Sequence, residues 1–146
     1  MEQRVNIEQS LPQVWKAMYG LEASLNKSGL TATQKHLIKI RASQLNSCAF
    51  CLNMHTKEAL KSGELQQRIF LLSAWRETDL FSAEEKAILT LTEEVTSIHL
   101  KGVSDDAYKQ AAQFFSAETI GEIIMAAVLI NAWNRIAVST HLPISQ

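Results

Sequence analysis

Apolar residues recur along this chain every three to four positions, the spacing that places side chains on one face of an α-helix. No stretch alternates apolar and polar residues for long, and only two prolines and five glycines interrupt the pattern. The chain is therefore predicted to be all-α. We expect a bundle of about seven helices in a single domain spanning residues 1–146, since no repeat, linker or low-complexity tract divides it.

Helix boundaries are marked by capping residues. The first helix is expected to begin near Leu11, with Pro12 in its first turn, and to stop around residues 28–29. Thr31 and Ser82 are each followed three residues later by Gln or Glu, which makes two capping boxes that open further helices. The other helices are expected from Asn46 or Ser47 to Ser62, from Leu65 to Trp75, from Ser82 through Ile98, from Ser104 to Phe115 and from Ala117 to about Ser139.

The last of these helices is apolar almost all round. A helix of that kind is either central in the fold or buried in a subunit interface, so we expect an obligate homo-oligomer. Its longest uninterrupted apolar run, Ile123 to Ile130, is too short to span a bilayer, and no membrane association is predicted.

Charge and composition narrow the classes of function. Lys plus Arg number 14 and Asp plus Glu number 15, so the chain lacks the basic excess or basic stripe that a nucleic-acid surface requires. The N-terminal segment mixes charges and has no apolar run, so no secretory signal is predicted and we expect a cytoplasmic protein. In that compartment a Cys-x-x-Cys pair is more often redox-active or metal-binding than a structural crosslink.

The two cysteines of the sequence, Cys48 and Cys51, lie close to His55. On a helix, at about 100° per residue, His55 is about 20° from Cys48 and Cys51 about 60° from it on the same side. Two sulfurs and an imidazole would then share one stripe. Small and apolar residues flank that stripe, while Lys57 and Lys61 lie opposite, so the sulfurs are expected to face inward and the lysines to face water.

The chemistry of Cys48, Cys51 and His55 favours a redox-active site. A thiolate is the reactive form of cysteine, and both a helix N-terminus and an imidazolium lower the pKa of a thiol. A spacing of three residues also allows a disulfide, whose very short loop contributes little stability. A metal site remains an alternative, with Cys48, Cys51 and His55 as ligands and a fourth from His36, His99 or His141; the spacing selects none of these three, and coincidental core cysteines remain a further alternative.

The run from His36 to His55, followed by Ala59 and Gly63, resembles the core motif of the AhpD-like family, the alkylhydroperoxidase and carboxymuconolactone decarboxylase superfamily. The resemblance is specific over residues 34–63 and extends more loosely through residues 75–77, 81–85 and 130–135. It implies an all-α bundle that assembles into symmetric trimers or hexamers. It also implies a cysteine pair that reduces hydroperoxides, needs no cofactor, and is recycled by a dithiol donor such as a lipoyl protein or a thioredoxin-like partner.

By position, the resemblance assigns Cys51 as the peroxide-attacking cysteine, Cys48 as the resolving cysteine and His55 as part of a proton relay. His36 stands where the family usually has a glutamate of that relay, and histidine can also carry protons near neutral pH. Proximity to the helix N-terminus would favour Cys48 as the reactive thiol, whereas the resemblance and His55 favour Cys51. A thiol-dependent peroxidase or disulfide reductase is thus expected; the alternatives are a decarboxylase of the carboxymuconolactone kind, whose family branch lacks the cysteine pair, and a non-enzymatic redox sensor.

Overall fold

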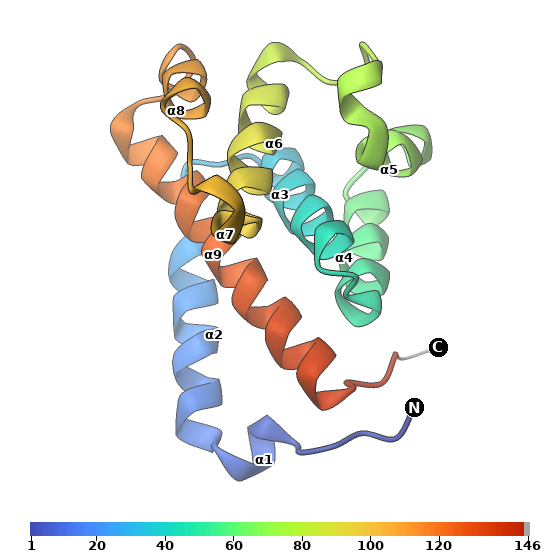
Figure 1. Ribbon diagram of the computed structural model, residues 1–146. Helices are drawn as coiled ribbons and strands as arrows, with labels where there is room; N and C mark the ends of the chain where they lie inside the picture. The colour runs from blue at the N-terminus through green and yellow to red at the C-terminus, as the bar shows by residue number, and fades with distance from the viewer. Residues whose placement is uncertain (145–146) are drawn as a thin grey trace.

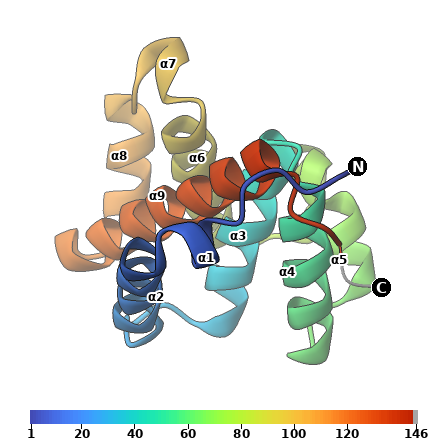
Figure 2. The same cartoon turned by 90° about the horizontal axis from the view of Figure 1, so that it is seen from below.

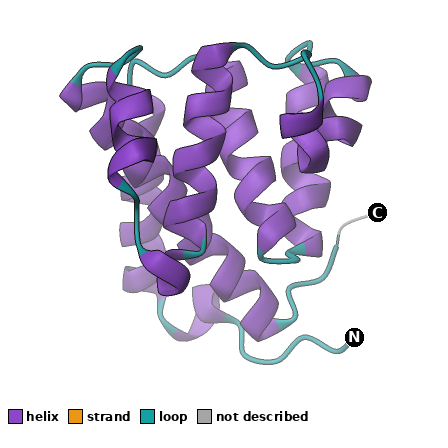
Figure 3. Cartoon of the chain, turned by 45° about the horizontal axis from the view of Figure 1, so that its top comes forward, coloured by secondary structure: helices purple, strands orange, loops and turns teal. Residues whose placement is uncertain are grey.

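The computed structural model describes residues 1–144, and within that range the chain is all-helical, with nine α-helices, one 3-10 helix and no strand (Figure 3). This confirms the predicted fold class. The helices are α1 (Ile7–Ser10), α2 (Pro12–Asn26), α3 (Ala32–Leu45), α4 (Ala49–Lys61), α5 (Gln66–Leu71), η1 (Leu72–Glu77), α6 (Ala83–Thr96), α7 (Ile98–Lys101), α8 (Asp105–Ala112) and α9 (Ala117–Thr140).

Helices α3, α6 and α9 pack on one another at the centre of the molecule (Figure 1). Helix α4 covers α3 on one side, α2 packs against α9, and α8 packs on α6 and α9. Seen from below, α9 crosses the whole bundle, with α2 and α8 near its start and both ends of the described chain near its end (Figure 2). The four helices α2, α3, α4 and α9 thus surround one region of the fold.

Helix α3 carries apolar side chains on two sides because it separates two apolar clusters. Ile38 and Ala42 face the cluster shared with α6, α8 and α9. Leu37 and Ile40 face a second cluster built with α4, α5, η1 and α6. All four side chains are at most 2% exposed, so α3 is held from both sides and its C-terminal end is fixed in position.

Several predicted boundaries are confirmed and others are wrong. The capping boxes at Thr31 and Ser82 are both present, and Ser104 and Ser116 cap α8 and α9 with their side chains. The expected stripe through Ile98 is wrong, because the helix ends at Thr96 and Ile98 begins the short helix α7, where it is 54% exposed. The expected helix from residue 65 to 75 is divided into α5 and the tighter η1.

Helix α9 occupies the position of a core helix. Its length and composition alone would suit a membrane span, but half of its most apolar stretch is buried inside the molecule. Met125 and Val128 are 40% and 43% exposed on its outer side. The prediction of a homo-oligomer therefore rests on these outward side chains and stays a prediction.

Candidate active site

The cysteine pair sits in the turn between α3 and α4. Ser47 has a positive φ of 51°, which reverses the chain after α3, and Cys48 is extended, with φ −86° and ψ 94°. Cys48 is therefore the N-cap of α4, and its Sγ accepts the backbone N–H of Cys51 at 3.3 Å. The expectation that Cys48 lies within the first helical turn is wrong by this one position, since the reversal at Ser47 delays the start of the helix.

A network of buried amides holds this turn against α9. The Asn46 side chain donates to the Oδ1 atoms of Asn131 and Asn134, each at 2.9 Å. Asn134 is fully buried and donates to Ser43 Oγ at 2.9 Å, while the Ser43 carbonyl accepts the Cys48 N–H at 3.0 Å. Fully satisfied buried amides fix one arrangement of their elements, because any displacement would leave a polar group unpaired. The position of Cys48 is therefore tied to the central helix.

Cys48 and Cys51 form a disulfide, with their Cα atoms 5.3 Å apart. The two residues are 1% and 2% exposed, so the prediction that the sulfurs face inward is confirmed. They pack with Ala137 at the end of α9, with Phe50 and with Leu142. Lys57 and Lys61 lie on the exposed side of α4, also as predicted.

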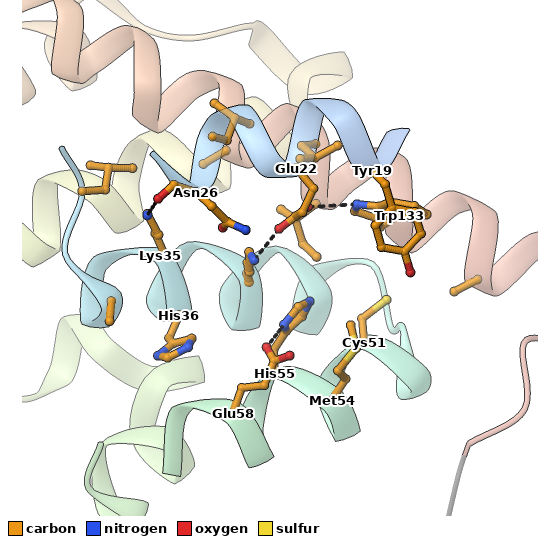
Figure 4. Close-up of a pocket in the computed structure, with 18 of the residues that line it drawn as sticks. Tyr19, Glu22, Asn26, Lys35, His36, Cys51, Met54, His55, Glu58 and Trp133 are labelled. Atoms are coloured by element: carbon orange, nitrogen blue, oxygen red, sulfur yellow. Dashed lines mark hydrogen bonds and ion pairs between the residues drawn. The ribbon is translucent and has the colours of Figure 1, made fainter. Parts of the chain in front are cut away.

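A cavity of about 660 Å³, which we call the large cavity, opens beside Cys51 between α2, α3, α4 and α9 (Figure 4). Most of its lining is apolar. The rings of Trp15 and Trp133 meet edge to face with centroids 5.1 Å apart, and the Tyr19 ring lies 5.5 Å from that of Trp133. Its size and lining are those of a small-molecule site, for which about 300–1,000 Å³ is usual.

His55 projects into the large cavity one helical turn after Cys51. Its Nδ1 lies 2.8 Å from Oε2 of Glu58, and because a carboxylate only accepts, Nδ1 carries the proton. Burial lowers the pKa of His55 below 6.5, and the hydrogen bond that His55 donates to Glu58 opposes this only in part. The imidazole is therefore neutral at pH 7, with Nε2 available to accept a proton.

His36 lines the same cavity from α3. Burial lowers its pKa, and the nearby Glu58 carboxylate opposes this effect. Its Nδ1 is buried without a hydrogen-bond partner in residues 1–144. Of the residues that the sequence analysis selected, Cys51, His55 and His36 line the large cavity, and Cys48 is joined to it through the disulfide with Cys51. The hydrogen-bonded partner of His55 is Glu58 and not the residue at position 36. Glu58 was missed; its spacing of three from His55 on one helix was the available signal.

The opposite wall of the large cavity carries an ion pair that the sequence analysis also missed. Glu22 bonds to Lys39 Nζ at 2.8 Å through one carboxylate oxygen and accepts the Trp133 indole N–H at 3.1 Å through the other (Figure 4). These groups join α2 to α3 and α9. They place a polar strip across an otherwise apolar cavity, facing His55.

The remaining histidines lie elsewhere. His99 is exposed on α7, and His141 ends α9 in a left-handed conformation. In the described part of the chain, no three His, Cys, Asp or Glu side chains gather closely enough to hold a metal ion. In this structure Cys48 and Cys51 are bonded to each other, so in the oxidised state their sulfurs are not free to bind a metal ion.

Residues 9–94 match the family model described as the carboxymuconolactone decarboxylase family. The chain belongs to this family. The uncharacterized protein YdfG of Bacillus subtilis is 42% identical to it over 139 residues, covering 95% of each chain. The match confirms the family resemblance that residues 34–63 carried.

Solved structures share the fold. A protein of unknown function from Agrobacterium tumefaciens, a candidate antioxidant defence protein AhpD, is 40% identical over 99% of each chain and superposes with a TM-score of 0.96. The debrominase Bmp8 is 16% identical, with a TM-score of 0.84 over 94% of this chain and 74% of that one. The first similarity supports an AhpD-like assignment, and the second concerns the fold alone.

Proposed function

We propose that this family member is a thiol-dependent peroxidase that reduces an organic hydroperoxide at Cys51 and stores the oxidation as the Cys48–Cys51 disulfide. One observation carries the proposal. A disulfide-forming cysteine opens onto an apolar cavity of about 660 Å³, one helical turn from a neutral histidine that a carboxylate orients.

In the first step His55 acts as a base. Its unprotonated Nε2 takes the proton of the Cys51 thiol, because burial keeps the imidazole neutral and Glu58 holds the proton on Nδ1. The thiolate attacks the terminal peroxide oxygen and the O–O bond breaks. Cys51 becomes a sulfenic acid, and the proton on His55 passes to the alkoxide, which leaves as an alcohol.

In the second step Cys48 attacks the sulfur of the sulfenic acid. The S–O bond breaks, a disulfide forms, and the hydroxide takes the Cys48 thiol proton and leaves as water. The N-cap position assists this step, since the Cys51 backbone N–H that reaches Cys48 Sγ at 3.3 Å also stabilises a Cys48 thiolate. In the disulfide the Cα atoms are 5.3 Å apart, a usual separation for this bond, and we propose that the amide network at the turn keeps the two residues near this separation in the reduced protein.

The cycle closes when an external dithiol reduces the disulfide, for which we propose a lipoyl protein or a thioredoxin-like partner. A homo-oligomer, a trimer or hexamer, located in the cytoplasm is part of the same proposal, and it is supported by the exposed apolar side chains of α9. A carboxymuconolactone decarboxylase activity is disfavoured by the redox-active pair, and a purely sensory role by the size of the cavity beside Cys51.

Sulfenic acid trapping tests the assignment of the two thiols. The reduced Cys48→Ser protein, treated with cumene hydroperoxide and a dimedone probe, is expected to carry the probe on Cys51. The reduced Cys51→Ser protein is expected to carry none on Cys48. Equal labelling of both variants, or labelling at Cys48 alone, would show that the helix end and not the histidine sets the nucleophile.

A further inference from the structure

The disulfide lies in a partition between two cavities. Cys51 lines the large cavity, whereas Cys48 lines a second cavity of about 370 Å³. Phe50, Ala137 and Leu142 line both cavities and pack on the cysteine pair, so they form the wall in which the bond is set. Of these two cavities, each cysteine lines only one.

The second cavity is built where both ends of the described chain approach the turn before α4 (Figures 1 and 2). Met1, the end of α9 with Val138, and residues 141–144 surround residues 47–50. Cys48 is only 1% exposed, and of the two cavities it lines this one alone. The Cys51 sulfur is equally shielded, and the large cavity is the access to it.

We propose that the second cavity admits the thiol end of the reductant, so that oxidant and reductant reach the disulfide from opposite sides. The inference rests on the proposed function, whose peroxide step occupies the large cavity. A thiolate entering the second cavity meets Cys48 Sγ first. It forms a mixed disulfide with Cys48, the Cys48–Cys51 bond breaks, and Cys51 leaves as a thiolate into the large cavity, where His55 lies.

The second thiol of the reductant then completes the exchange. It attacks the sulfur of its own arm in the mixed disulfide and releases the Cys48 thiolate, which the Cys51 backbone N–H stabilises at the N-cap. The arm leaves as a cyclic disulfide. Two electrons and two protons pass from the dithiol to the protein, which ends with both thiols reduced.

The lining also indicates the chemical class of the reductant. Among the described residues around the second cavity, the titratable groups are the Met1 α-amino group, His141 and, in the reduced protein, Cys48, and most of the other side chains are apolar. A dithiol on an uncharged aliphatic arm brings no charge into such a cavity other than that of its attacking thiolate. Glutathione carries two carboxylates and an ammonium group, and it would have to lose their hydration or stay outside.

Two valines of α9 give a matched pair of variants. Val138 lines the second cavity and is 47% exposed, whereas Val128 lines neither cavity and is 43% exposed. The full-length protein is oxidised with diamide, and its reduction by dihydrolipoamide is followed by alkylation and intact mass. Val138→Trp is expected to slow reduction about tenfold or more, and Val128→Trp to leave it within twofold of wild type. Oxidation of the reduced proteins by cumene hydroperoxide is expected to be equal in all three.

A second variant tests the cavity without blocking it. Val138→Lys adds a positive charge at the entrance and is expected to raise the rate of reduction by glutathione several-fold, with a smaller change for dihydrolipoamide. Unchanged reduction in both Val138 variants, or equal slowing of oxidation and reduction by Val138→Trp, would overturn the inference. Because diamide forms the disulfide independently of peroxide, absent peroxide turnover would refute the proposed function alone.

Discussion

Replacing Glu58 by Gln tests how the cavity controls the reactive thiol. The change preserves the size of the side chain but removes the carboxylate that lies 2.8 Å from His55 Nδ1. With Gln, the amide NH2 group can face the ring and favour the tautomer in which Nε2 carries the proton. His55 would then be unable to take the proton of Cys51.

The size of the effect follows from the exposure of Glu58. A hydrogen bond to a charged group contributes about 1.5–3 kcal/mol when shielded, but this side chain is 49% exposed, and exposed ion pairs contribute only about 0.2–1 kcal/mol. We therefore expect Glu58→Gln to raise the activation free energy of sulfenic acid formation on Cys51 by about 1 kcal/mol, which is roughly a fivefold slower reaction at pH 7. His55→Ala, which removes the base itself, is expected to cost about a hundredfold.

The pH dependence gives a second readout of the same variant. Glu58 opposes the effect of burial on the pKa of His55, so its removal lowers that pKa further. The rate falls where His55 becomes protonated, and the acidic limb of the profile therefore moves to lower pH in Glu58→Gln. Probe labelling of Cys51 in a Cys48→Ser background measures both quantities, with Glu84→Gln, an exposed carboxylate on α6, as the charge-matched control. An unchanged rate and limb, or a limb moved to higher pH, would refute the role of Glu58.

Three further predictions concern stability and assembly. Burial lowers the pKa of His55 in the folded protein, so as the pH falls the unfolded chain takes up the His55 proton before the folded protein does. The contribution of His55 to the free energy of unfolding is therefore full above about pH 6.5 and decreases below it. In His55→Gln the urea midpoint should change less between pH 6.5 and 5 than it does in the wild type. Burial alone would raise the pKa of Glu93, but hydrogen bonds from Trp75, Arg76 and Arg41 hold it below the ordinary value. Glu93→Gln should therefore lower the free energy of unfolding in urea by about 2 kcal/mol. A decrease of less than about 0.5 kcal/mol would contradict this. The outward apolar face of α9 predicts an oligomer by light scattering at micromolar concentration, and a stable monomer would contradict it.

The helices could be read from the sequence wherever a cap and a sustained stripe coincide. Thr31, Ser82 and Ser104 each mark a helix start that the structure confirms, because their side chains bond to the helix backbone locally. The short helices α1 and α7 have only four residues each, which is too few to establish a period. The number of helices was therefore underestimated.

The position of the site could be predicted from the sequence, but the protonation state of His55 could not. The spacing of Cys48, Cys51 and His55 was enough to place them together, since all three are held by one turn and one helix. Burial keeps His55 neutral, and this burial depends on α2 and α9, which are distant from His55 in the sequence. The sequence alone therefore favoured an imidazolium beside the thiol. The division of the two sulfurs between two cavities likewise required the packing of residues 137–144 on the turn.

Stoichiometric peroxide reduction tests the central claim most directly. The fully reduced protein, mixed anaerobically with one equivalent of cumene hydroperoxide, is expected to lose about two mass units as the Cys48–Cys51 disulfide forms and to release one equivalent of cumyl alcohol. Cys51→Ser should do neither. Peroxide that remains unconsumed while both thiols stay alkylatable, or equal consumption by Cys51→Ser, would contradict the assignment of this protein as a thiol peroxidase.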